Sequence, residues 1–177
     1  MIAYKALSER VKNNNGLVIA INLLDKAITY ITVIFYLAYL VYGVYMIPKD
    51  SGVLLYRSIL VPGVSFIVVS LYRKIVSSPR PYQVYGFTPA LKKDTDGKSF
   101  PSRHVFSIFI VAFTVMQTSL ILGILISIAG FILGIIRVVG GVHFIKDVLA
   151  GFAIAAITAI ACYWILCGVF GSLMLPF

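Results

Sequence analysis

Histidine is scarce in this sequence of 177 residues, and both of its histidines lie beside residues that could support chemistry. His104 ends a Pro-Ser-Arg-His run, and His143 precedes Asp147 by four residues. On a helix, that spacing places the imidazole and the carboxylate on one face. The carboxylate can then accept the Nδ1 proton of His143, fix its tautomer and leave Nε2 as a nucleophile or base. Taken alone, such a pair at a membrane interface is more often a structural polar contact than a functional one.

Basic residues gather around the two histidines. The chain has 15 Lys and Arg against 6 Asp and Glu, a formal net charge of +9. Much of the excess lies in a few stretches, at Arg73, Lys74, Arg80, Lys92, Lys93, Lys98, Arg103, Arg137 and Lys146. This cluster indicates an acidic partner, either a lipid headgroup or a phosphorylated substrate. On charge alone, a cytoplasmic loop that follows the positive-inside rule explains it equally well.

The rest of the chain predicts an all-α, polytopic transmembrane helix bundle. Hydrophobic residues make up 60% of the sequence and charged residues 12%, with a mean hydropathy of +1.00. Such a composition excludes a nucleic-acid-binding arm, a disordered chain and a disulfide-stapled secreted module. A helix needs about 20 apolar residues to cross the hydrocarbon core. We therefore predict five spans, at 27–47 (or from near 22), 52–72, 102–118, 120–139 and from 148 to near 170.

The charge-free run 105–136 determines where the histidines lie. A single helix of that length would reach about 48 Å, which is too long for one crossing. The polar triplet at 117–119 is the only plausible reversal in the run. Two spans then separate His104 from His143, so both imidazoles and the basic cluster are predicted to meet at one membrane surface. The whole chain, 1–177, is predicted to be one membrane-embedded domain.

Two segments lie outside the predicted spans. Residues 1–16 carry apolar residues at near-helical spacing and predict an amphipathic helix on the membrane surface. Residues 77–101 form a polar loop outside the membrane, and a loop of that length is often functional. Its acidic stretch at 94–97 is interpreted as a turn rather than a calcium loop. Cys162 and Cys167 match no metal-binding spacing and are predicted to be packing residues.

Three motifs follow one another along the second half of the chain. The first consists of a basic residue, six further residues and Arg80-Pro81. Arg73 lies at the basic position by this spacing, whereas Lys74 is one residue too close to Arg80. We favour Arg73, because spacing constrains geometry more than side-chain type and guanidinium binds phosphate well. The second motif is the run 101–104, Pro-Ser-Arg-His.

The third motif is Arg137, five residues, His143, three residues and Asp147. In this order the motifs resemble the signature of the type 2 phosphatidic acid phosphatase superfamily, which also includes the vanadium haloperoxidases and glucose-6-phosphatase. The chain departs from that signature where Arg73 stands for Lys, Arg103 for Gly and Ile136 for Ser.

The resemblance implies phosphoryl transfer without a metal or other cofactor. His143 would attack phosphorus and form a phosphohistidine, with Asp147 orienting the ring. His104 would protonate the leaving oxygen and then deprotonate the water that hydrolyses the intermediate. Arg73 (or Lys74), Arg80, Ser102, Arg103 and Arg137 would bind the phosphoryl oxygens.

A site at a bilayer surface suits a lipid whose phosphate lies in the headgroup layer. The resemblance thus implies a multi-pass cell-membrane phosphatase acting on phosphatidic acid, phosphatidylglycerophosphate or an isoprenyl pyrophosphate. Lipid phosphate and the bilayer are its expected partners, with no nucleic acid, and the oligomeric state is left open. The family usually faces its site away from the cytoplasm, and we expect the same here although the charge distribution favours the reverse. The alternative function is a non-catalytic lipid-phosphate binder or carrier, which would need the arginines but not two histidines and an aspartate.

Overall fold

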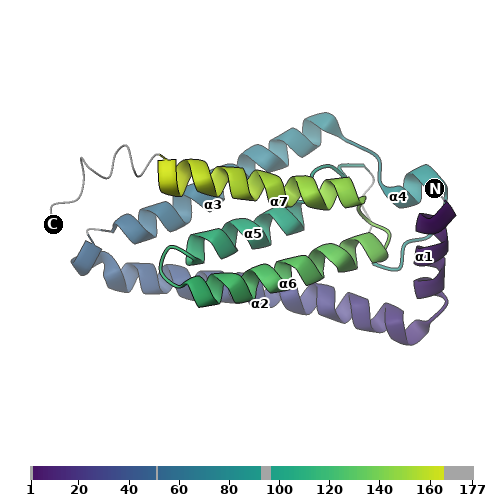
Figure 1. Cartoon of the computed structure of the whole chain (residues 1–177), viewed down its shortest axis with the longest axis horizontal. Helices are drawn as coiled ribbons and strands as arrows, with labels where there is room; N and C mark the ends of the chain where they lie inside the picture. The colour runs from purple at the N-terminus through teal and green to yellow at the C-terminus, as the bar shows by residue number, and fades with distance from the viewer. Residues whose placement is uncertain (1, 51, 93–96, 166–177) are drawn as a thin grey trace.

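The computed structural model describes residues 2–50, 52–92 and 97–165, and the elements assigned in them are all helices (Figure 1). Five helices run along the bundle: α2 (Asn15–Asp50), α3 (Val53–Val76), α5 (Arg103–Val115), α6 (Leu120–Val139) and α7 (Ile145–Ala159). A π-helical segment, η1 (Ile160–Ile165), continues α7. Helix α1 (Ile2–Lys12) lies across one end of the bundle, where the single-turn helix α4 (Pro81–Tyr85) also lies. We call this the α1 end. The predicted helical membrane bundle is confirmed.

Four of the described helices, α2, α3, α6 and α7 with its continuation, are long and apolar enough to cross a membrane. The predicted reversal at 117–119 is confirmed: Ser119 is the N-cap of α6, and its hydroxyl accepts a hydrogen bond from the Leu122 N–H at 3.4 Å. Helix α6 covers the predicted fourth span, 120–139. The predicted third span is shorter than expected, because α5 has 13 residues and reaches only about 20 Å.

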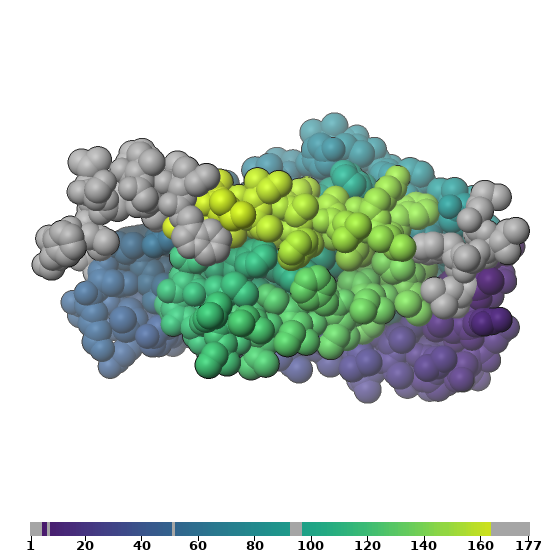
Figure 2. Space-filling model, viewed as in Figure 1, coloured from purple at the N-terminus to yellow at the C-terminus, as the bar shows by residue number. Residues whose placement is uncertain are grey.

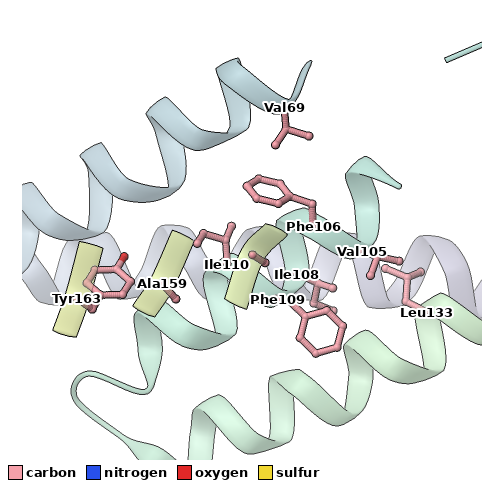
Figure 3. Packing of buried hydrophobic residues seen from close by; sticks show 10 residues of the cluster. Val69, Val105, Phe106, Ile108, Phe109, Ile110, Leu133, Ala159 and Tyr163 are labelled. Carbon is pink, nitrogen blue, oxygen red and sulfur yellow. The ribbon is translucent and has the colours of Figure 1, made fainter. Parts of the chain in front are cut away.

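Helix α5 is the central element, and most of its residues are buried. Phe106, Phe109 and Ile110 of α5 pack between α3, α6 and α7, where they form one cluster with Val69 and Leu133 (Figure 3). A helix covered by protein does not have to match the bilayer thickness. Its ends are therefore determined by packing against its neighbours rather than by the thickness of the lipid.

The outer helices carry an apolar exterior. Side chains such as Ile34 of α2, Leu60 of α3 and Ile121 of α6 are more than half exposed. The space-filling view shows α6 and α7 covering one long side of an elongated body (Figure 2). Contiguous exposed apolar surface of this kind marks a membrane-facing protein.

The helix boundaries differ from the predictions at both ends of the chain. Helix α2 begins at Asn15, well before the predicted span, and the Asn14 side chain accepts a hydrogen bond from the Leu17 N–H at 3.1 Å. Helix α7 begins three residues earlier than predicted, at Ile145. Cys162 is half-buried in η1 and forms no disulfide among the described residues. The predicted end of the last span near 170, Cys167 and the first three residues of the 94–97 turn lie outside the described residues.

Helices α5 and α7 approach each other closely at Gly151. A Cβ at this position would lie 2.7 Å from the Ser102 carbonyl oxygen and 3.2 Å from the Phe106 nitrogen, and both are backbone atoms. We expect Gly151→Ala to lower the free energy of unfolding by about 1–3 kcal/mol, the usual cost of overpacking. The measurement is the thermal unfolding midpoint in detergent. Gly63→Ala is the control, because a Cβ at Gly63 meets nothing within 4 Å; equal midpoints for the two variants would contradict the prediction.

Candidate active site

His143 lies in the turn between α6 and α7, and not on α7 as its four-residue spacing from Asp147 predicts. The helical interpretation of this pair is therefore wrong. Phe144 is the N-cap of α7 with an extended backbone, and the N–H groups of Val142 and His143 both donate to the Arg137 carbonyl at 3.2 Å. Gly141 takes a φ of +79°, a conformation that favours glycine. This turn presents His143 at the C-terminus of α6.

Despite this difference, His143 and Asp147 meet. The His143 Nδ1 lies 3.5 Å from Oδ2 of Asp147, and both side chains are buried. The Phe144 N–H donates to the same oxygen at 2.9 Å, and the Ser99 hydroxyl donates to it as well. Ser99 Oγ also lies 3.4 Å from His143 Nδ1. The carboxylate is thus held by three neighbours and faces the Nδ1 side of the imidazole.

The surroundings of His143 favour its neutral form. Burial lowers the pKa of His143 to about 4, because the imidazolium is poorly solvated there. The hydrogen bond and negative charge of Asp147 oppose this shift, whereas the charges of Arg80 and Arg137 add to it. At neutral pH the ring is therefore uncharged, which is the form that a nucleophile or general base requires.

Arg73 is a buried cation at the end of α3. Its guanidinium donates to the carbonyl oxygens of Lys98 and Pro101, and its charge interacts with those of the other arginines of the motifs. The neighbouring Lys74 is exposed. The two candidates for the first-motif cation thus lie in different environments, and it is Arg73 that faces the 97–101 segment.

Arg80 and Arg137 flank residues 141–144, the turn that carries the candidate nucleophile His143 and that we call the nucleophile turn. Arg80, 2% exposed, donates from Nε to the Gly97 carbonyl and from Nη1 to the Val142 carbonyl, both at 2.9 Å. Arg137, in the last turn of α6, instead pairs with a carboxylate: its Nε lies 2.7 Å from Oδ1 of Asp25, and its Nη2 lies 2.9 Å from Oδ2.

The second motif begins α5. Ser102 is the N-cap; its N–H donates to the Asp147 carbonyl at 2.8 Å, and its buried hydroxyl has no hydrogen-bond partner in the part of the chain that the structure describes. Arg103 is exposed and lies 5.4 Å from the centre of the Phe66 ring. His104 is half-buried in the first turn of the helix.

A cavity of about 230 Å³ adjoins His104. It lies between α2, α3, α5 and α6, and most of its wall is apolar. Arg103, His104 and Ser107 contribute its polar groups on α5, and Thr29 contributes one on α2. His143 is not among its lining residues. The structure therefore places both histidines at the α1 end, with the nucleophile candidate in the buried arginine cluster and His104 on the cavity.

Sequence reasoning missed two residues of this site. Ser99 bonds Asp147 but belongs to no motif, so its sequence carries no signal. Asp25 belongs to no motif either, yet a carboxylate inside a largely apolar helix is itself a signal, because an intramembrane charge needs a partner.

The sequence profile of the PAP2 superfamily matches residues 53–168, which is more than half of the chain. The chain therefore belongs to the PAP2 superfamily, as the three motifs indicate. A curated relative, the bacitracin transport permease protein BcrC of Bacillus licheniformis, is 30% identical over 105 residues. That alignment covers 57% of this chain and 52% of the relative, so the chain spans about half the length of that relative.

Two crystal structures share the fold. LpxE of Aquifex aeolicus aligns with a TM-score of 0.66 and 19% identity, over 90% of this chain and 92% of that one. A PAP2-type phosphatidylglycerolphosphate phosphatase of Bacillus subtilis aligns with a TM-score of 0.50 and 20% identity, over 99% and 96% of the two chains. At these identities the likeness concerns the fold.

The low pKa of His143 can be measured directly. Because the chain has two histidines, His104→Gln leaves a single imidazole for ¹⁵N NMR. We expect the His143 signal to stay neutral from pH 8 to below pH 6 and to protonate towards about pH 4. Adding Asp147→Asn removes a negative charge that favours the His143 imidazolium, so the pH of half-protonation of His143 should fall further. Half-protonation near the ordinary value of 6.5 would contradict the proposed burial of a neutral ring.

Proposed function

We propose that the chain is an integral membrane lipid phosphatase that hydrolyses a phosphate monoester or pyrophosphate through a phosphohistidine intermediate. The observation that carries the proposal is a buried, neutral His143 that faces Asp147 and lies within a cluster of arginines. Membership of the PAP2 superfamily supports a phosphatase, and the phosphatidylglycerolphosphate phosphatase among the similar structures supports a lipid substrate.

In the proposed reaction, Nε2 of His143 attacks phosphorus, and a P–N bond forms as the P–O bond to the lipid breaks. His104 gives its proton to the leaving oxygen, then removes a proton from the water that attacks phosphorus and breaks the P–N bond. Asp147 stabilises the imidazole as it becomes cationic. Arg73, Arg80 and Arg137 stabilise the phosphoryl oxygens in the transition state, with Ser102 and Arg103 as further phosphate contacts.

The cavity beside His104 supports a lipid leaving group. In the proposed reaction His104 acts on the leaving oxygen, so the group that leaves with this oxygen lies next to His104. The cavity adjoins His104 and has a mostly apolar wall that includes Phe66, Ile108 and Leu133. The extracytoplasmic orientation and the choice among the three lipid substrates stay predictions.

Phosphate release from purified protein tests the proposal. We expect hydrolysis of phosphatidic acid, phosphatidylglycerophosphate or an isoprenyl pyrophosphate in mixed micelles, with turnover that persists in excess chelator and is inhibited by vanadate. The described residues include no group of three or more His, Cys, Asp or Glu side chains placed to hold a metal ion. His143→Ala is the control for contaminating activity. Binding of these lipids without phosphate release would favour the binder, and activity that requires added magnesium would contradict the mechanism.

Labelling with ³²P distinguishes the proposed roles of the two histidines. His104→Ala keeps the nucleophile but lacks the acid and base, so a substrate with a good leaving group should phosphorylate His143 and leave it trapped. We expect a ³²P label on His104→Ala that is lost in acid, as a phosphoramidate should be, and no label on His143→Ala. A label on His143→Ala, or near-normal turnover by either variant, would overturn the assignment.

The first-motif cation can be identified by two neighbouring substitutions. Arg73 is buried against the carbonyls of Lys98 and Pro101, whereas Lys74 is exposed. We expect Arg73→Ala to lower kcat on the order of 10²-fold or more, the usual effect of losing a transition-state charge partner. Lys74→Ala is the matched control and should stay close to wild type. The reverse order would assign the role to Lys74.

A further inference from the structure

Arg137, a buried arginine of the site, contacts a carboxylate from a distant part of the chain. Arg73 and Arg80 donate to backbone carbonyls, whereas Arg137 makes a two-point contact with the carboxylate of Asp25. The side chains of Arg137 and Asp25 are only 5% and 15% exposed. The Nη2 contact is a hydrogen bond and the Nε contact is a close ion pair. Two contacts between a guanidinium and a carboxylate restrict the orientation as well as the position of both groups.

Asp25 comes from a part of the chain that the superfamily profile does not match. It lies on α2, 112 residues before Arg137, and the matched region begins at residue 53. Lys26 follows Asp25 in a helix that is otherwise largely apolar, and a buried carboxylate in such a helix is costly unless it is paired. The pairing therefore links the first long helix to a motif residue of the site.

The ion pair lies beside the groups proposed to react. The carbonyl of Arg137 accepts the N–H groups of Val142 and His143, so the same residue supports the nucleophile turn. One turn deeper on each helix, Thr29 and Leu133 line the cavity that adjoins His104. The pair is thus positioned between the nucleophile turn and the cavity wall.

We propose that Asp25 is a positioning residue, which holds the Arg137 guanidinium by Nε and Nη2 so that Nη1 can meet a phosphoryl oxygen. Among the described residues Nη1 has no recorded hydrogen-bond partner. The inference rests on the proposed phosphatase function. Without the carboxylate, a long and flexible arginine side chain would have to be ordered by the substrate itself, and a misplacement of about 1 Å can cost on the order of 10²-fold in rate.

The test is a double-mutant cycle with activity as its first readout. Asp25→Asn keeps the size of the side chain but turns an NH₂ donor towards the guanidinium, so we expect kcat to fall about 10²-fold with a smaller change in KM. Asp25→Glu restores the carboxylate and should recover part of the loss. In an Arg137→Ala background, Asp25→Asn should cause no further decrease, whereas in an Arg73→Ala background its effect should multiply.

Asp50→Asn is the matched control, because it makes the same chemical change on the same helix. The Asp50 carboxylate accepts the N–H groups of Gly52 and Leu54 at 3.0 Å each, at the far end of α2. This variant should keep wild-type kcat and KM within about twofold. Thermal unfolding midpoints of all variants separate loss of folded protein from loss of rate.

Vanadate binding followed by ⁵¹V NMR gives a second readout that needs no turnover. We expect Asp25→Asn to weaken vanadate binding about tenfold or more in the wild-type background and not at all with Arg137→Ala. An equal decrease in both backgrounds, unchanged affinity or tighter binding by Asp25→Asn would overturn the positioning role. A wild-type protein that releases no phosphate would instead refute the proposed function, and the vanadate cycle would still decide the role of Asp25.

Discussion

The structure of this site depends on placing several arginine cations in a poorly hydrated interior. A buried charge without partners is costly, so each guanidinium needs acceptors for its N–H groups. Backbone carbonyls are acceptors for Arg73 and Arg80, and the Asp25 carboxylate is an acceptor for Arg137. The carbonyls belong to the 97–101 segment and to Val142 in the nucleophile turn. The conformation of these segments and the position of the cations therefore depend on each other.

The arrangement of the helices follows from the need to bring these segments together. Helix α5 begins at the same end of the bundle at which α6 ends and α7 begins. There the Ser102 N–H donates to the Asp147 carbonyl at the start of α7. Close contact of α5 and α7 at Gly151 allows this bond, because a side chain at that position would meet the α5 backbone. The short, buried α5 thus acts as the common support for the second and third motifs. Its apolar side chains stabilise the bundle, and its first turn carries His104.

Length, hydropathy and motif spacing were sufficient to predict the helical bundle, the reversal at 117–119 and the α6 span, because each depends on local composition. Hydropathy could not predict the short α5, since burial in protein and burial in lipid select the same residues. A spacing of four could not distinguish one helix from a turn followed by an N-cap, and so His143 was placed on α7. Ser99 and Asp25 were missed because their partners come from distant parts of the chain. Of these two, only Asp25 carries a signal of its own, as a carboxylate within an apolar stretch.

The N-terminal helices show that the site extends beyond the motif region. Ser8 of α1 is buried, and a Cβ at Gly141 in the nucleophile turn would lie 2.7 Å from its hydroxyl. On α2, the Asn22 amide donates to the Ala90 carbonyl at 2.9 Å and accepts from the Lys92 N–H at 3.2 Å. These two bonds attach residues 90–92 of the loop 77–101 to α2.

The same helix α2 lines the cavity beside His104 through Thr29, Thr32 and Val33. The candidate reacting groups and the surroundings of the leaving group are thus encoded in different parts of the sequence. Substitutions in α2 can alter the cavity and the Asp25 contact to Arg137. They leave unchanged the sequences of α5 and of the turn between α6 and α7, which carry the two histidines. Under the proposed function, selection among lipid substrates can therefore act on α2 without displacing the groups proposed to perform the phosphoryl transfer.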